Sequence, residues 1–170
     1  MSNPEQRIFD GCYDGVKLLE PDFYEDFRGH YWTIYKEDNS GLRFNHDKAT
    51  ISRKNSLRGI HGDFSTTKMI SCLSGEVYCV IVDNRKTSKT YNQWRWIMLT
   101  DTNKKSIILP PGVGLSYLVM SDSATVLYKL AYEGSYQDVG EQFTILWNDK
   151  NLDIFWPIDK PILQQRDSAK

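Results

Sequence analysis

The amino-acid sequence predicts an all-β sandwich or barrel, and four observations lead to that prediction. Apolar residues come in short runs that often alternate with polar ones, which is the periodicity of half-buried strands. Turn-forming residues separate these runs at short intervals. No segment sustains the apolar spacing of an amphipathic helix. Aromatic residues make up 13% of the chain, and such residues favour pleated, half-buried surfaces.

The N-terminal third is the least regular part of the chain. We expect strands at 16–19 and 30–35, with a polar turn at 26–29 between them. Residues 42–51 mix apolar and charged positions. In a strand, side chains alternate between the two faces, so one face would carry Leu42, Phe44, His46 and Lys48. A strand face that carries His and Lys beside Leu and Phe is more natural in the wall of a polar pocket than in a plain core.

The strongest strand signals follow in the centre of the chain. Residues 69–83 predict two strands joined at Ser74 and Gly75. Further strands are expected at 94–100, 106–109, 115–120, 125–132 and 143–147. One short helical turn is left open near 149–153, and the tail from Lys160 is expected to be irregular structure over the surface. Many short strands at this spacing are typical of a sandwich or barrel.

Length and charge exclude several classes of protein. The 170 residues fit one domain, and no linker or internal repeat divides them. Lys and Arg number 21 against 22 Asp and Glu, so there is no basic excess to hold a nucleic acid. No apolar run approaches the roughly 20 residues of a membrane span. The N-terminus lacks the features of a secretory signal, and we therefore expect a cytoplasmic protein.

The cysteines point to no disulfide framework. Cys12, Cys72 and Cys79 are an odd number and show no C-x-x-C spacing, which also argues against a zinc site. We expect them to be small buried apolar residues in a reducing compartment.

Imidazole chemistry is confined to three positions, His30, His46 and His61. Gly59 and Gly62 flank the pair Ile60–His61. Because glycine has no side chain, it lets backbone or ligand approach closely. Arg58 lies three residues before His61 and suits a phosphate group. Taken alone, His61 also fits a hydrogen-bonded structural histidine beside a turn.

A catalytic metal is not expected. Small double-stranded β-barrels often hold a metal with an H-x-H motif, a later Glu and a His after a P-x-G turn. Here Asp63 stands in the second position, and no histidine follows Pro111 and Gly112. A G-x-G-x-x-G motif and a P-loop are also missing, so no cofactor is signalled.

Three further residues lack a decisive local signal. Lys68 lies seven residues after His61, where a solvated strand-edge lysine is the ordinary interpretation. Tyr128 points inward by period-2 alternation, as a core tyrosine with a backbone hydrogen bond would. Asp167 lies close to the C-terminus and, taken alone, fits a frayed tail.

A series of short segments, in chain order, gives these residues a joint context. The segments are Asp26–Gly29, Leu57–His61, Lys68, Ser74–Val77, Val82–Arg85, Pro110–Gly112, Val126–Lys129, Trp147–Asp149, Trp156–Pro157 and Leu163–Asp167. Together they resemble the cupin-fold family of dTDP-4-dehydrorhamnose 3,5-epimerases, from about residue 16 to residue 167. The resemblance implies a single cupin-type jelly roll (a double-stranded β-helix barrel) over 1–170, a homodimer to which residues 1–35 contribute an interface, and an active site without metal or cofactor.

The resemblance also implies roles for individual residues. His61 resembles the general base, and Asp167 resembles its carboxylate partner. Lys68 resembles the group that stabilises an enolate, and Tyr128 resembles the general acid.

Substrate-binding positions follow from the same resemblance. Arg28 and Arg58 resemble residues that bind the substrate and its diphosphate. His46 and Lys48 stand where the family carries Gln and Asn, ahead of the Arg-Gly-x-His segment. In this family the N-terminal region of the neighbouring subunit usually completes the pocket, which would apply to Arg28.

Two departures from the family pattern affect the expected substrate. Leu115 replaces a histidine after the Pro-x-Gly turn, and Gly62 stands where the family tends to carry an aromatic residue. Segments 58–63 and 128–134 are more similar to a second branch, whose members epimerise GDP-4-keto-6-deoxy-heptoses in bacterial capsule synthesis. We therefore predict a cofactor-independent epimerase that inverts C3, C5 or both in a nucleotide-linked 4-keto-6-deoxy sugar, with a GDP-heptose as the expected substrate.

Four other functions stay open at this point. They are a C3-only epimerase, a dTDP-4-dehydrorhamnose 3,5-epimerase, a 3,4-ketoisomerase and a non-catalytic carbohydrate-binding jelly roll. A carbohydrate-binding jelly roll would explain the aromatic content. It would give no common function to four residues, namely His61, Lys68, Tyr128 and Asp167.

Overall fold

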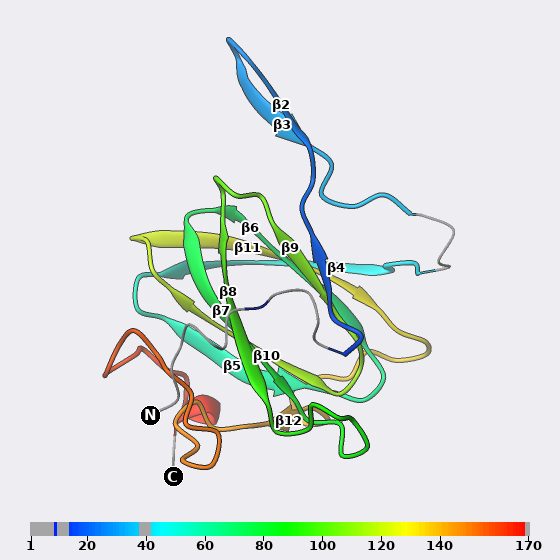
Figure 1. Cartoon of the computed structure of the whole chain (residues 1–170), viewed down its shortest axis with the longest axis vertical. Coiled ribbons are helices and arrows are strands. Elements are labelled where there is room, and N and C mark those ends of the chain that lie inside the picture. Colours follow the sequence, from blue (N-terminus) through cyan, green and yellow to red (C-terminus); the bar gives the residue numbers. More distant parts are fainter. Residues whose placement is uncertain (1–8, 10–13, 38–41, 169–170) are drawn as a thin grey trace.

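Two five-stranded antiparallel sheets make up the body of the protein in the computed structural model, which describes residues 9, 14–37 and 42–168 (Figure 1). The first sheet has the order β1 (Lys17–Leu19), β9 (Ser106–Leu109), β6 (Thr67–Ser74), β11 (Ser123–Ala131) and β4 (His46–Arg53). The second has the order β12 (Phe143–Thr144), β5 (Leu57–Gly62), β10 (Val113–Val119), β7 (Glu76–Asp83) and β8 (Trp94–Thr100). This jelly roll confirms the predicted all-β fold.

The two sheets are held together by an apolar core, and β7 shows how the sequence builds it. One side of β7 presents Val77, Cys79 and Ile81 to the core between the sheets. Its other side presents Tyr78 and Val80 to a second cluster, formed with the C-terminal segment after β12. Because both faces of β7 are covered, its sequence is a nearly continuous apolar run instead of an alternating one.

Most strand predictions are confirmed, with corrections near the ends of the chain. The predicted run at 143–147 forms only the two-residue strand β12, although Ile145 still exchanges two backbone hydrogen bonds with Ile60 of the neighbouring strand. Residues 149–153 form hydrogen-bonded turns, not a helix. The only helical element in the described residues is the single 3₁₀ turn η2 (Gln165–Asp167).

Strand β5 was not predicted, and the reason lies in its composition. Its sequence contains two glycines, an arginine and a histidine, and it therefore lacks the apolar run that marks the other strands. Backbone pairing with its two neighbours holds this segment in a strand instead, since β5 pairs with β10 on one side and with β12 on the other.

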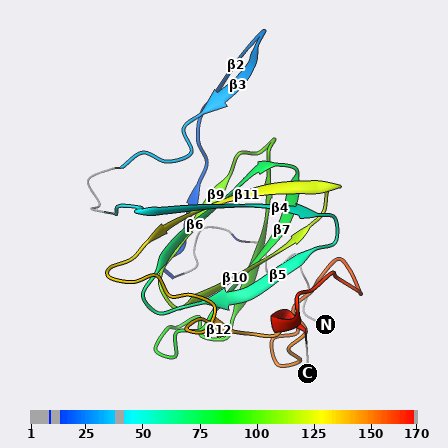
Figure 2. The ribbon, with the colours of Figure 1, turned by 180° about the vertical axis from the view of Figure 1, so that it is seen from behind.

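A two-stranded hairpin projects away from the barrel, as Figures 1 and 2 show from opposite sides. It consists of β2 (Phe23–Asp26) and β3 (Gly29–Trp32). Its exposed aromatic side chains are Phe23, Tyr24, Phe27 and Tyr31. The ammonium of buried Lys104 lies 4.6 Å from the ring centroid of Phe23 and 5.2 Å from that of Trp32. These cation–π contacts attach the base of the hairpin to the turn between β8 and β9.

Two remaining sequence predictions concern cysteines and membranes. Cys72 and Cys79 are free and buried, which confirms the expected burial of both thiols, while Cys12 lies outside the described residues. Within the described part of the chain, no helix is long and apolar enough to cross a membrane.

Candidate active site

A pocket of about 190 Å³ lies between the two sheets, and both sheets contribute side chains to it. Strands β4, β6 and β11 supply Lys48, Thr50, Lys68, Tyr128 and Leu130. Strands β5 and β10 supply Arg58, His61 and Leu115. Three residues from the C-terminal third complete the wall, namely Tyr136, Gln142 and Gln164. Five of the eight predicted site residues therefore line one pocket, and a sixth, Asp167, lies directly behind it.

His61 and Asp167 form a hydrogen-bonded pair in the wall of this pocket. The Nε2 atom of His61 lies 2.5 Å from Oδ1 of Asp167, whose side chain is fully buried. The other carboxylate oxygen accepts hydrogen bonds from the backbone N–H of Gly59, at 3.3 Å, and from Nε2 of Gln164, at 3.2 Å. With Nε2 bonded to the carboxylate, the second ring nitrogen, Nδ1, is the one available to accept a proton.

The environment of Asp167 favours its ionised form. Burial acts to raise the pKa of this carboxyl group. The hydrogen bond and charge of His61, with the bonds from Gly59 and Gln164, outweigh burial and hold the pKa below its ordinary value. Asp167 is therefore a carboxylate that orients the imidazole and can stabilise it when it becomes charged.

Local features of two segments bring this pair together. Gly59 has a φ of +105°, and a Cβ at this position would lie only 2.4 Å from the carbonyl oxygen of Leu115. Only glycine therefore allows β5 to approach β10 closely and to direct the Gly59 N–H at Asp167. The C-terminal segment returns to β5 through a parallel bridge between Ser56 and Ile162, and η2 then turns Asp167 inward.

The expectation of a frayed C-terminus is wrong for this stretch. The tail is irregular, as predicted, but Asp167 is only 1% exposed. It is held in place by the bridge at Ile162 and by its own hydrogen bonds.

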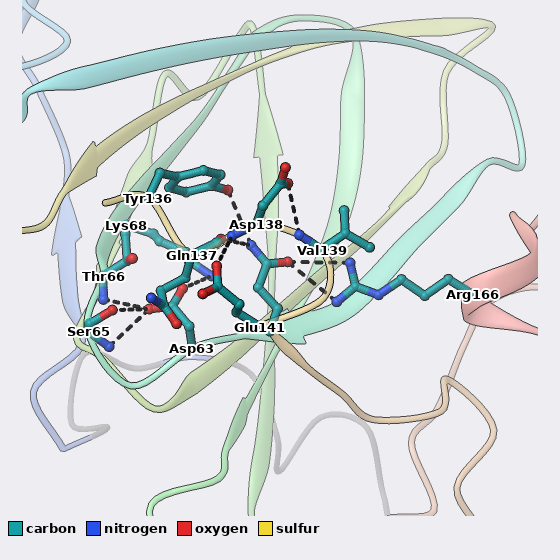
Figure 3. Close-up of polar contacts among 11 residues, drawn as sticks. Asp63, Ser65, Thr66, Lys68, Tyr136, Gln137, Asp138, Val139, Glu141 and Arg166 are labelled. Atoms are coloured by element: carbon teal, nitrogen blue, oxygen red, sulfur yellow. Dashed lines mark hydrogen bonds and ion pairs between the residues drawn. The ribbon is translucent and has the colours of Figure 1, made fainter. Parts of the chain in front are cut away.

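Lys68 is a buried cation with a fixed partner, so the interpretation as a solvated strand-edge lysine is also wrong. It is 7% exposed, and its ammonium lies 3.2 Å from Oδ2 of Asp63. The other oxygen of Asp63 accepts hydrogen bonds from the backbone N–H groups of Ser65 and Thr66 (Figure 3). Burial raises the pKa of Asp63, but these N–H groups and the charge of Lys68 bring it below its ordinary value. Asp63 thus fixes the direction in which Lys68 points.

Tyr128 lies on β11, in the sheet opposite the one that carries His61. Its side chain is half-buried in the pocket wall, and burial together with the neighbouring Tyr117 hydroxyl raises its pKa well above 10. At neutral pH the phenol therefore keeps its proton. His61 and Tyr128 thus line the same pocket from opposite sheets.

Cations and an aromatic ring occupy the open side of the pocket. The ammonium of Lys48 lies 4.1 Å from the ring centroid of Tyr136, a cation–π distance. The Nε atom of Arg58 donates to Oγ of Ser52 at 2.9 Å, which holds the guanidinium beside the pocket. With Lys68 deeper inside, the pocket suits an anionic ligand that also presents a flat ring.

The segment between β11 and β12 lines one side of the pocket with Tyr136 and Gln142. The amide nitrogen of Gln142 donates to the hydroxyl of Tyr136 at 3.2 Å. The guanidinium of Arg166 contacts Oε1 of Gln142 at 3.4 Å and donates to Oγ1 of Thr144 at 2.9 Å. Arg166 therefore connects this segment to the turn that carries Asp167.

Two predicted site residues do not line the pocket. His46 contacts two tyrosines instead, with Nδ1 3.1 Å from the hydroxyl of Tyr132 and its ring centroid 5.1 Å from that of Tyr136. Arg28 is exposed on the β2–β3 hairpin and pairs with Asp26 at 2.6 Å. Substrate contact by either residue stays a prediction, and the β2–β3 hairpin, whose turn contains Arg28, projects away from the barrel of its own chain (Figure 1).

Sequence reasoning missed several residues of the site. Thr50 follows Lys48 on the same strand face, so extending the alternation by two residues would have found it. Tyr117 follows Leu115 in the same way. Asp63 was considered only as a metal ligand, and no local signal pairs it with Lys68. Among the described residues, no group of three or more His, Cys, Asp or Glu side chains is placed to hold a metal ion.

Known proteins resemble this chain over most of its length. The family model described as dTDP-4-dehydrorhamnose 3,5-epimerase matches residues 12–170. The dTDP-4-dehydrorhamnose 3,5-epimerase of Salmonella typhimurium is 34% identical over 164 residues, covering 91% of this chain and 88% of that enzyme. The enzyme of the same name from Methanothermobacter thermautotrophicus is 32% identical over 175 residues, covering 96% and 92%.

Solved structures agree with the same relationship. The crystal structure of dTDP-4-dehydrorhamnose 3,5-epimerase from Bacillus anthracis, with TDP and PPi bound, has a TM-score of 0.86 at 31% identity and covers 94% of this chain and 95% of that one. The dTDP-6-deoxy-D-glucose-3,5-epimerase of Legionella pneumophila, in complex with dTDP-4-keto-L-rhamnose, has a TM-score of 0.85 at 31% identity, with 94% and 88% covered.

Proposed function

This chain belongs to the dTDP-4-dehydrorhamnose 3,5-epimerase family, and from that premise we propose that it inverts C3, C5 or both in a nucleotide-linked 4-keto-6-deoxy sugar. The observation that carries the proposal is the His61–Asp167 pair facing Tyr128 across one pocket. An inversion requires a base on one face of a carbon atom and an acid on the other. The two facing sheets supply one group each.

The chemistry of a 4-keto sugar explains why this set of residues is sufficient. The ketone acidifies the hydrogens on C3 and C5, because either carbanion delocalises onto the C4 oxygen. An imidazole has an ordinary pKa of about 6.5, so its neutral form is available as a base near neutrality. The reaction needs no redox step, because hydrogen leaves and returns as a proton.

Each residue has one proposed task. His61, oriented by Asp167, removes the proton from the carbon next to the ketone. Lys68, held by Asp63, stabilises the negative charge that develops on the C4 oxygen; loss of one such group typically costs about 10²–10³ in rate. Tyr128 then delivers a proton to the opposite face of the carbon, and the C4 carbonyl forms again.

The anionic part of the substrate has a proposed place as well. Arg58 and Lys48 lie at the open side of the pocket and would bind the diphosphate. The half-buried ring of Tyr136 would lie against a flat or apolar face of the ligand. These are proposals of ours, supported by the charge and position of the side chains.

A dTDP-linked sugar is the first candidate substrate, because the relatives described above are named for dTDP sugars and one of their structures holds TDP. The expected GDP-heptose finds no support in these relatives. It stays a second candidate because of one observation: apolar Leu115 pairs with His61 in the pocket wall, where the family pattern has a histidine. A different side chain beside the base would accommodate a different sugar.

We also propose a homodimer in which residues 1–35 contribute to the interface. The hairpin carries four exposed aromatic side chains, which is a surface typical of an interaction site. In such a dimer, Arg28 of one subunit would reach the pocket of the other, since the hairpin that carries it projects away from the barrel of its own chain.

Deuterium incorporation tests the proposed function. The protein is incubated in D₂O with a dTDP-linked and, separately, a GDP-linked 4-keto-6-deoxy sugar, and the products are analysed by NMR. Label with inversion at C3 and C5 is expected with one nucleotide. Label at C3 alone identifies a C3-only epimerase, and a ketone moved to C3 identifies a 3,4-ketoisomerase. Binding without any exchange contradicts catalysis and leaves a carbohydrate-binding jelly roll.

A further inference from the structure

Gln164 contacts a buried carboxylate and also lines the pocket, and the reaction proposed above gives it no task. Its Nε2 atom donates to Oδ2 of Asp167 at 3.2 Å, and its side chain forms part of the pocket wall. Asp167 is 1% exposed, whereas Gln164 is exposed. A neutral amide is therefore the accessible partner of a carboxylate that solvent does not reach.

The backbone of Gln164 is held by the turn that follows it. Gln164 is the N-cap of η2, and its carbonyl accepts hydrogen bonds from the backbone N–H of Asp167, at 3.0 Å, and from the hydroxyl of Ser168, at 3.1 Å. Ser, Thr, Asp and Asn are preferred at an N-cap, because their side-chain oxygen accepts a bond from a backbone N–H. The side chain of Gln164 makes no such bond. It reaches the carboxylate of Asp167 instead, so it serves the carboxylate and not the turn.

The donors around Asp167 are divided unequally between its two oxygens. Oδ1 faces Nε2 of His61, while Oδ2 accepts from the backbone N–H of Gly59 and from Gln164. Gly59 lies on β5 and Gln164 on the C-terminal segment, so rotation of the carboxyl group would break a bond to each of them. A proton on Oδ2 would meet two N–H groups, which makes this oxygen a poor site for protonation. The two donors therefore keep Oδ1 directed at His61.

The charges around Asp167 agree with this geometry. Burial raises the pKa of Asp167, but the hydrogen bond and charge of His61, together with the N–H donors, bring it below its ordinary value. Arg53 and Arg58 line a groove of about 410 Å³ together with Asp167 and Gln164. Asp167 is the only carboxylate among the described residues that line this groove. A second negative charge at the position of Gln164 would therefore act directly on Asp167.

We propose that Gln164 is a positioning residue, which directs Oδ1 of Asp167 at His61 and keeps the carboxylate ionised while His61 acts as the base. This inference rests on the proposed function. In that reaction the C–H bond next to the ketone breaks, its proton moves to Nδ1 of His61, and the electron pair delocalises onto the C4 oxygen. The ionised carboxylate stabilises the imidazolium that forms. Gln164 contributes to the rate through Asp167 and neither takes nor gives a proton.

A double-mutant cycle tests whether Gln164 acts through Asp167. Gln164→Met keeps the length of the side chain and removes its polar atoms. In the otherwise wild-type protein, exchange of substrate hydrogen with D₂O at saturating sugar should fall by about threefold to thirtyfold, which is less than for a fully buried bond to a charged group because Gln164 is exposed. In an Asp167→Asn background the same change should lower the rate by less than about twofold. A role in folding or in substrate contact would give the same loss in both backgrounds.

The pH profile supplies a second measurement that a structural role would not change. Gln164→Glu has almost the same shape but places a carboxylate where the amide now lies, 3.2 Å from Oδ2 of Asp167. Two carboxylates this close share a proton, so the pKa of Asp167 rises and His61 loses its ionised partner as the pH falls. Exchange should fall at least about tenfold more at pH 6 than at pH 9, where both carboxylates ionise. Gln165→Glu is the matched control, because Gln165 is exposed and does not line the pocket, and it should retain the wild-type profile.

Three results would overturn the role of Gln164 while the wild-type protein still exchanges substrate hydrogen and the proposed function stands. They are a folded Gln164→Met with an unchanged rate, an equal loss from Gln164→Met in the two backgrounds, and a Gln164→Glu profile parallel to that of Gln165→Glu. If Gln164→Met does not fold, the comparison of the two Glu variants decides alone. A wild-type protein that exchanges hydrogen in no nucleotide-linked 4-keto sugar is a separate result, in which the function fails and the role of Gln164 fails with it.

Discussion

His61 and Asp167 are 106 residues apart in sequence, and their contact is the residue pair on which the proposed chemistry depends. The local sequence does not predict a functional role for either residue, because His61 lies in a glycine-rich strand and Asp167 in the C-terminal tail. Only the resemblance to a family joined them before the structure was known. The structure adds the carboxylate's two other hydrogen bonds, from Gly59 and Gln164, which hold it ionised.

Asp167→Asn tests the carboxylate with almost no change of shape. An amide can hold the imidazole ring but does not stabilise the imidazolium, and it can select the wrong tautomer. We expect epimerisation to fall by about 10²–10⁴-fold with little change in KM. Asp122→Asn, on the exposed turn before β11, is the matched control. An Asp167→Asn protein with activity near that of the control would mean that His61 works alone.

Acid stability provides a prediction at a second carboxylate, Asp83. This residue is fully buried and accepts hydrogen bonds from Arg85 and Thr90. Burial raises its pKa, but these contacts outweigh burial and lower it from 3.8 to about 2. Because the folded pKa is depressed, its contribution, about 2 kcal/mol, is present above pH 4 and is lost as the pH falls toward 2.

Urea unfolding of wild-type protein and Asp83→Asn measures this contribution directly. The difference in unfolding free energy between the two should be largest near pH 6 and should shrink between pH 4 and pH 2. A difference that stays constant over this range would show that the charge of Asp83 does not stabilise the fold.

Strand β5 and the short strand β12 form the element that places His61. Gly62 and Gly114 leave the space that the ring of Phe143 fills, and this packing sets where β12 and the segment before it lie. A Cβ on Gly62 would come within 2.3 Å of the Phe143 ring. Since the segment before β12 supplies Tyr136 and Gln142 to the pocket, we expect a change in packing at Gly62 to alter the pocket wall.

Gly62→Ala is therefore expected to destabilise the protein by about 1–3 kcal/mol, as overpacking does, and to raise KM. Gly140→Ala is the control in the same segment, because a Cβ there meets no atom within 4 Å. Thermal unfolding and steady-state kinetics of the two variants provide the measurement. Equal behaviour of the two would show that β12 does not depend on this contact.

The elements also show how far sequence reasoning extends. Strands β6 to β11 follow from alternation and turn residues, because their side chains face a core on at least one side. Strand β5 does not, since its glycines and polar residues serve close approach and the pocket. The Asp63–Lys68 pair and the contact between the rings of Tyr117 and Tyr128 were also out of reach, because they depend on how strands and turns meet in space.

At the level of the whole molecule, the projecting hairpin bears on the proposed dimer and on which subunit would supply Arg28. Lys104 contacts the rings of Phe23 and Trp32 at the base of the hairpin within a single chain, so this contact needs no partner. If a second copy receives the hairpin, each pocket combines His61 of one subunit with Arg28 of the other.

Mixing two inactive variants tests this arrangement. Arg28→Ala and His61→Ala chains, coexpressed, should recover about a quarter of the wild-type activity, because half of the randomly paired dimers contain both chains and each of these has one intact site of two. The two variants purified separately and assayed without subunit exchange are the control. Activity no greater than the sum of the parents would place Arg28 in its own subunit's site or outside any site.

The most direct measurement compares wild-type protein with His61→Asn in D₂O, using the nucleotide-linked 4-keto sugar that the wild type accepts. NMR follows replacement of hydrogen at the carbons next to the ketone. We predict rapid labelling by the wild type and a loss of at least about 10²-fold in His61→Asn, with unfolding temperatures close to each other. Labelling by His61→Asn at the wild-type rate would contradict the account, because some other group would then remove the proton.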